Sequence, residues 1–516
     1  MQPDPFAAKR AALREEFFAR LFLLGGTNTC KRTTWAAVPD VALARANRRR
    51  RWAGLPLSRN YSMEGHGRPV RAGPSPGGSE AFGHGMAGDH DPYAALRLRD
   101  YRCLLAGAVL SSVGAGVLTV AVGWELYQRT GEPFALGLAG LVQFLPVLLL
   151  SLPAGHAVDR YSRKHLLHLA QGLTALAAVG LAALSGFHGP VPLFYVCLLL
   201  VGCARACAMP ARSALLAQIV PAETLGNAVT WNSSGWQVAN VAGPALGGFV
   251  YGCTGRGAEA YLLTAALSLA CAALLAPVRP KAAARRHLAP SLESLLTGVR
   301  FVWRTELLLA AITLDLFAVL LGGATALLPV YADSVLHIGP VGLGWLRAAP
   351  ALGALVMALF LAHRPPLSRA GVALLASVAA FGAATVGFGF STDPVLSFAL
   401  LALTGAFDNV SVVVRQTLMQ RLTPDEMRGR VAAVNAVFIS SSNELGEFES
   451  GLTAQLVGPV ASVVGGGVGT ILVVLAVMLR WPRLLRLGAL SAVRPRDEPP
   501  RHREHREEKI EKSEPI

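Results

Sequence analysis

The sequence has few charged residues for its length, and this shortage excludes most soluble folds. Of its 516 residues, 15% are Asp, Glu, Lys or Arg and 53% are hydrophobic, whereas a soluble domain carries about 25% charged residues. The deficit is concentrated between about residues 103 and 480. Apolar runs of ~18 residues or more recur there, and each can cross ~30 Å of hydrocarbon as a helix.

The same stretch lacks the alternation of polar and apolar residues that a membrane β-barrel needs. Within a continuous apolar run, only a helix satisfies every backbone polar group internally. The sequence therefore predicts an all-α integral membrane protein.

Motifs that would bind a metal or a nucleotide are also absent. The seven cysteines have no metal-ligand spacing, and the glycine-rich run 465–470 lacks the lysine of a phosphate loop. No stretch is typical of an ATPase domain, and no nucleophile and base stand in an arrangement typical of an enzyme. We therefore expect a protein that is not an enzyme, has no metal and no cofactor, and draws its energy from an ion gradient.

The net charge of +15 does not indicate a nucleic-acid partner, because the basic residues fall in short loops and two polar tails. Residues 1–90 are rich in Arg, Gly, Pro and Ser without apolar periodicity, so we expect a disordered basic extension there. The apolar stretch 17–24 is too short for a signal peptide and is interrupted by Arg20. The tail 483–516 is charged and contains proline, so we expect it to be solvated.

Twelve apolar runs predict two six-helix bundles, residues 91–278 and 306–482, joined by a basic linker at 279–305. The predicted spans are 104–125, 134–154, 165–185, 191–211, 227–251, 260–277, 306–331, 341–361, 370–390, 395–418, 431–456 and 459–480. On these spans, Lys and Arg gather in the linker and the loops on its side, and the opposite side holds only Arg129 and Arg256. This asymmetry predicts that both termini lie in the cytoplasm and that the protein resides in the cytoplasmic membrane.

The two predicted bundles are an internal repeat. Five residues of the first half recur 203 residues later in the same order and spacing: Arg212, Pro221, Glu223, Gly226 and Asn232 match Arg415, Pro424, Glu426, Gly429 and Asn435. A second site repeats at an offset of 204, where Gly140, Gln143 and Pro146 match Gly344, Arg347 and Pro350. A parallel repeat of six helices is the plan of two-half transporters, whose substrate site lies between the halves near the midplane.

The loop after the second span resembles the signature loop of the major facilitator superfamily, G-x-x-x-D-R-x-x-R-R/K. Its residues Gly155, Asp159, Arg160, Arg163 and Lys164 match every defined position. The resemblance implies a twelve-helix transporter whose loop latches the two halves in the outward-facing state. Family-like sequence begins only near residues 91–93, so one hypothesis places the working start at Met86.

The fifth span ends in Gly243, Pro244, Gly247 and Gly248, which resembles the distal part of an exporter-associated motif of that superfamily. Two earlier glycines of the motif are replaced by Thr230 and Ala239, and the fourth span lacks the R-x-x-Q-G element of proton-coupled drug exporters. These departures weaken a direct transfer of the proton-drug antiport mechanism. Over residues 91–480 the sequence is most similar to the enterobactin-exporter-like branch, which includes siderophore exporters and proteins named after drug or macrolide export.

Ionisable residues inside a span are costly, by about 3 kcal/mol on insertion scales, and usually face a partner or a water path. Asp315 and Arg347 fall at similar depths in the seventh and eighth spans, so we hypothesise that they pair or share a cavity. Candidates for proton coupling are Asp315, Asp408 and Glu444, and we interpret Glu447 and Glu449 as lying near the outer mouth. Residues predicted to line the substrate path are Asn409 on the tenth span and Gln237 and Asn240 on a polar stripe of the fifth span.

These patterns predict a monomeric secondary transporter that exports a small amphipathic molecule by alternating access, with protons as the coupling ion. The expected partners are that molecule, an ion gradient and the lipid bilayer. An uptake symporter is the first alternative, and a non-transporting membrane scaffold or sensor on the same fold is the second. A membrane-embedded enzyme is a third.

Overall fold

Long antiparallel helices make up almost all of the regular structure. The computed structural model describes residues 91–280, 292–365 and 367–488, all within the unit Met86–Ile516. Every regular element in these ranges is helical. The predicted extension 1–90, residues 281–291 of the predicted linker and the tail from 489 lie outside the described residues.

The first half contains six long helices and two short ones. They are η1 (Ala95–Arg97), α2 (Arg99–Thr130), α3 (Pro133–Arg160), α4 (Arg163–Gly186), α5 (Val191–Ile219), η2 (Ala222–Thr224), α6 (Leu225–Thr254) and α7 (Gly257–Leu275). Tight turns separate them because the residue that ends a helix often has left-handed backbone angles that glycine adopts without strain. Gly131 ends α2 in this way and Gly255 ends α6, each with φ +68°.

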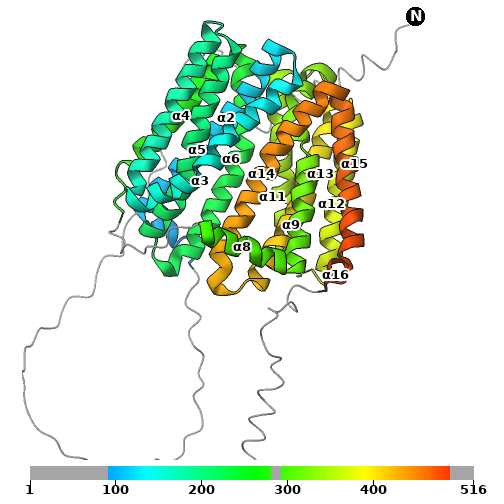
Figure 1. Ribbon diagram of the computed structural model, residues 1–516. Coiled ribbons are helices and arrows are strands. Elements are labelled where there is room, and N and C mark those ends of the chain that lie inside the picture. Colours follow the sequence, from blue (N-terminus) through cyan, green and yellow to red (C-terminus); the bar gives the residue numbers. More distant parts are fainter. Residues whose placement is uncertain (1–90, 281–291, 366, 489–516) are drawn as a thin grey trace, which may run out of the picture. The chain divides into compact units, whose positions relative to one another are not determined.

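The second half begins with a short helix at the bundle's end and then repeats the pattern. Its elements are α8 (Leu292–Arg304), α9 (Glu306–Leu321), η3 (Ala324–Leu327), α10 (Leu328–Val330), η4 (Tyr331–Val335), α11 (Gly339–Ala362), α12 (Ala370–Phe390), α13 (Pro394–Leu422), α14 (Asp425–Val457), α15 (Pro459–Arg480) and α16 (Pro482–Leu485). Figure 1 shows α2 to α6 on one side, α9 to α15 on the other, and α8 across one end. That end is called the linker end below, and the opposite one the far end.

Ten of the helical segments in the described ranges are long and apolar enough to cross a membrane. Two further long helices, α6 with 30 residues and α14 with 33, are not among those ten. Both pack inside the bundle, α6 against α2 and α11, and α14 against α3 and α9. Each of these two helices therefore contacts both halves of the bundle.

The predicted seventh span, 306–331, is not one continuous helix. α9 ends at Leu321, and the chain continues through Gly322 and Gly323 into η3. A Cβ atom on Gly323 would lie 2.7 Å from the Gly446 carbonyl oxygen and 2.7 Å from the Ser450 hydroxyl of α14. The two glycines break the helix because they combine backbone freedom with the space that α14 needs.

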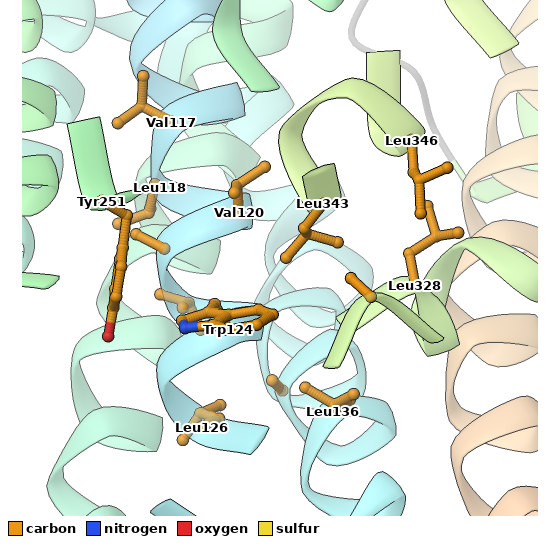
Figure 2. Close-up of a cluster of buried hydrophobic side chains, with 14 of the residues drawn as sticks. Val117, Leu118, Val120, Trp124, Leu126, Leu136, Tyr251, Leu328, Leu343 and Leu346 are labelled. Carbon is orange, nitrogen blue, oxygen red and sulfur yellow. The ribbon is translucent and has the colours of Figure 1, made fainter. Parts of the chain in front are cut away.

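The hydrophobic cores differ between the two ends of the bundle. At the far end, one cluster joins both halves, and Figure 2 shows Val120 and Trp124 of α2 pointing toward Leu343 of α11. At the linker end, each half has its own cluster, around Leu215 in the first half and around Leu418 in the second. The halves are therefore sealed together at the far end and separately packed at the linker end.

Candidate functional site

A cavity of about 490 Å³ lies between the halves, toward the linker end. Its lining comes from three helices of the first half and one of the second: Leu105, Ala108, Val109, Ser112, Arg212, Asn232, Ser233, Trp236, Gln237, Asn409 and Val412. This set includes Gln237 and Asn409 from the predicted path, together with Ser233 of α6. Asn240 is half-buried on the same helix and does not line it.

A second cavity, of about 190 Å³, lies inside the second half beside the broken end of α9. Asp408, Asn443 and Glu447 line it together with the backbone around Gly322 and with Phe381. A third, of about 50 Å³, lies between the halves and is lined by Gln143, Arg347 and Glu447. Glu447 thus faces two interior cavities and does not mark the outer mouth, contrary to the sequence interpretation.

Two carboxylates of α14, those of Glu444 and Glu447, lie against Gly140 on α3 of the first half. A Cβ atom on Gly140 of α3 would lie 3.0 Å from a Glu447 carboxylate oxygen and 3.6 Å from one of Glu444. Residues three positions apart share one face of a helix, so both carboxylates point to the same place. Gly140 leaves the room that these two side chains occupy.

Glu444 forms an ion pair with Arg205 of α5, at 3.3 Å between Oε1 and Nη2. Of the ion pairs between described side chains, this one alone joins the two halves. The Arg205 side chain is 49% exposed and that of Glu444 16%. Because the Arg205 side chain reaches solvent, separating this pair costs less than separating a fully buried pair, so a conformational change can break it.

Asp315 does not pair with Arg347, so the pairing part of that hypothesis is wrong. The Asp315 carboxylate pairs with Arg415 of α13, and both side chains are at least nine-tenths buried. Arg347 instead lies 3.6 Å from Glu447 and donates a hydrogen bond to the Thr325 carbonyl oxygen at 3.3 Å. Depth along a helix places two residues at one level, but the direction in which each side chain points decides whether they meet.

The matched signature loop lies at the linker end. Gly155, Asp159 and Arg160 belong to the last turns of α3, and Arg163 begins α4. The Asp159 side chain lies outside the described residues. The Lys164 ammonium donates hydrogen bonds to the carbonyl oxygens of Ala276, at 2.5 Å, and Val278, at 3.0 Å. It thereby satisfies carbonyls that the end of α7 leaves without helical partners.

The glycines of the fifth-helix motif let α6 approach two neighbours closely. A Cβ atom on Gly243 would lie 2.8 Å from the Val113 carbonyl oxygen of α2, and one on Gly247 would lie 2.8 Å from the Val117 Cα. Gly248 faces the other half, where a Cβ atom would lie 2.9 Å from the Gly344 Cα and would also contact the Pro340 carbonyl oxygen. Pro244 lies buried between these contacts.

Polar contacts between the halves extend this packing at the far end. The Gln128 amide donates a hydrogen bond to Asp333 at 2.8 Å, and the hydroxyls of Tyr127 and Ser334 are 2.8 Å apart. With the apolar cluster below them, these contacts close the far end. Solvent therefore approaches the large cavity from the linker end.

Sequence reasoning missed Arg205, Trp236 and the role of Glu447. Arg205 and Arg212 stand seven residues apart on one helix, and Glu444 and Glu447 three apart on another. Each spacing places a pair on one helix face, which is the signal that would have shown these charges facing the junction. The described residues contain no group of His, Cys, Asp and Glu that could hold a metal ion.

A family model described as Major Facilitator Superfamily matches residues 104–446. Among curated proteins, the chain is similar to the multidrug efflux pump Tap of Mycobacterium tuberculosis (strain ATCC 25618 / H37Rv), with 27% identity over 360 residues, 66% of this chain and 84% of that protein. It is also similar to the enterobactin exporter EntS of Escherichia coli O1:K1 / APEC, with 28% identity over 395 residues, 75% of this chain and 92% of that one.

Solved structures give the same fold at lower identity. A bacterial homolog of the human lysosomal transporter Spinster, in an inward-facing and occupied conformation, superposes with a TM-score of 0.60 and 16% identity, over 75% of this chain and 97% of that one. A mutant of the nucleoside transporter NupG superposes with a TM-score of 0.58 and 11% identity, over 74% of this chain and all of that one.

Proposed function

The chain belongs to the Major Facilitator Superfamily and is a multi-pass membrane transporter, not an enzyme, and we propose that it is a proton-coupled exporter of a small amphipathic molecule. The matched relatives named as a multidrug efflux pump and an enterobactin exporter support the outward direction. The proposal counts α6 and α14 as spans too, which makes twelve in the bundles 91–278 and 306–482. It also treats the protein as a monomer.

We infer that the linker end faces the cytoplasm, because Lys and Arg gather in the loops on that side. The structure would then be inward-facing, with its far end closed and its large cavity reached from the cytoplasm. An exporter loads its substrate in this state. An uptake symporter releases its substrate in the same state, so the direction of transport has to be measured.

The observation that carries proton coupling is the Arg205–Glu444 pair. It joins the halves and is only partly buried, so protonation of Glu444 would remove a negative charge and loosen this connection. The Asp315–Arg415 pair is a poor coupling site, because breaking a buried pair costs about 3–5 kcal/mol. Asp408 is the second candidate, since it lines the 190 Å³ cavity and forms no ion pair with any described residue.

The test is proton movement in liposomes that contain the purified protein, followed with a pH-sensitive dye while candidate substrates are added. We expect substrate-dependent proton movement with the native protein and none with Glu444→Gln. The control Glu132→Gln removes an exposed carboxylate at the far end and should behave like the native protein. The double variant Arg205→Gln, Glu444→Gln leaves neither charge alone, so it should exchange substrate without moving protons.

Each other outcome has a definite meaning. Unchanged proton movement in Glu444→Gln would transfer the coupling role to Asp408. Substrate movement without protons in the native protein would contradict proton coupling altogether. A native protein that is folded and moves no compound would favour the scaffold alternative.

A further inference from the structure

One arginine in the first half of the repeat has no ion-pair partner among the described residues, although its counterpart in the second half has one. Arg415 of the second half pairs with Asp315, and Arg212 is the residue 203 positions earlier than Arg415. At the two offsets of the repeat, the residues that correspond to Asp315 are Ser112 and Ser111. Both are serine, so the first half lacks the carboxylate that its arginine would need.

The structure brings the corresponding pair together without a charge to match. Ser112 and Arg212 line the same 490 Å³ cavity. The Arg212 side chain is half-buried and forms no hydrogen bond or ion pair within the described part of the chain. Even a half-buried guanidinium is costly when no partner compensates its charge, and a bound anion would reduce that cost.

The rest of the cavity lining fits an organic anion. None of the described residues that line it is acidic, and its polar members are hydroxyls and amides. The side-chain oxygen of Asn409 is buried there and accepts no hydrogen bond from a described residue, so it can accept one from a ligand. Trp236 is 58% exposed and offers a flat apolar ring. The volume lies in the range of about 300–1,000 Å³ typical of small-molecule sites.

We propose that this cavity binds the anionic group of an aromatic organic anion through Arg212, with a donor of the same ligand on Asn409 and its ring against Trp236. The inference rests on the proposed function, because it assigns the class of molecule that the transporter carries. A guanidinium presents donors in a fixed fork that matches carboxylate, sulfonate and phosphate oxygens.

The test compares two probes with the same ring system, anilinonaphthalene sulfonate and the uncharged phenylnaphthylamine. Binding is measured by calorimetry on the purified full chain in phosphatidylcholine nanodiscs, with empty nanodiscs subtracted. We expect Arg212→Gln to weaken sulfonate binding by roughly 10- to 100-fold, since hydrogen bonds to a charged group are lost. Binding of the uncharged probe should stay the same, and Arg212→Lys should be intermediate.

A second variant tests the reasoning from the repeat and does not remove Arg212. Ser112→Asp supplies the carboxylate that the second half has, so it should neutralise Arg212 and abolish sulfonate binding. Ser112→Asn adds a side chain of the same size as Asp without the charge, so it should weaken sulfonate binding much less than Ser112→Asp does. Arg256→Gln, at an exposed far-end arginine, should also have no effect.

The proposal is overturned if the native chain binds no sulfonate, if Arg212→Gln binds both probes as the native chain does, or if it loses both equally. Loss of sulfonate binding when phosphatidylglycerol replaces phosphatidylcholine would assign Arg212 to a lipid headgroup and overturn the substrate class. These binding measurements use no proton gradient. A failure of proton coupling in liposomes would therefore leave the anion site standing, and the reverse also holds.

Discussion

The contact at Gly248 predicts that a single added side chain will open the far end. The replacement is Gly248→Val, in the middle of the surface where α6 of the first half meets α11 of the second. Even the Cβ atom would lie 2.9 Å from the Gly344 Cα and would contact the Pro340 carbonyl oxygen. Both are backbone atoms, so neither can rotate away. Overpacking of this kind costs about 1–3 kcal/mol.

The cost falls on one conformation. The α6–α11 contact joins the halves only while the far end is closed, so the closed state loses the stability and the open state does not. At about 1.4 kcal/mol per factor of ten, a loss of ~2 kcal/mol shifts the equilibrium toward the open state roughly 30-fold. Transport should slow, because the state that loads from the linker end becomes rare.

The assay is cross-linking between cysteines at Gln128 and Asp333, which are hydrogen-bonded across the far end at 2.8 Å, in a chain whose seven native cysteines have been replaced. A short bifunctional reagent should join them in the parent protein and much less in Gly248→Val. The matched control is Gly226→Val on the same helix, where a Cβ atom would meet nothing within 4 Å. Equal cross-linking in Gly248→Val and the parent, or an equal loss in the control, would refute the reasoning.

Two further predictions concern stability. Asp315→Asn leaves Arg415 as an unpaired buried charge, so the free energy of unfolding should fall by about 3–5 kcal/mol; thermal unfolding in detergent measures this, and a wild-type midpoint would contradict it. Lys164→Met removes the donor to the carbonyls of Ala276 and Val278, so that end of α7 should exchange amide hydrogens faster. The cost is about 1–3 kcal/mol, and hydrogen exchange that is unchanged there would show that water replaces the ammonium.

The helices were predictable from the sequence because membrane spans are long and locally apolar. The predicted fifth and eleventh spans contain many polar residues, and they too are long helices, α6 and α14. The break after Leu321 was not predictable from the apolar pattern, since the run continues through it. It depends on the close approach of α14, a contact between residues more than a hundred positions apart that no local pattern contains.

Charged residues were predictable as a set but not as partners. The cost of burying charge selected Asp315, Arg347 and Glu444 from the sequence, and all three form ion pairs. Their partners depend on helix rotation, which a single sequence does not determine. The site residues that the sequence did not select, such as Arg205, lie at the junction of the halves, where the partner comes from the other repeat.

The repeat explains why the unpaired charges gather in this region. Arg205 and Asp408 occupy corresponding positions 203 residues apart with opposite charge. Arg205 meets Glu444, but the residue that corresponds to Glu444 at the same offset in the first half is Val241. Among the described residues, Asp408 and Arg212 therefore lack ion-pair partners for the same reason: the corresponding position that would supply the opposite charge carries an uncharged residue, Val241 in one case and Ser112 in the other. A charge retained without its partner needs another source of compensation, and a transporter has two, a proton for the carboxylate and an anionic substrate for the guanidinium. It follows that Ser112→Asp should abolish anion binding, whereas Asp408→Asn, which leaves Arg212 untouched, should not.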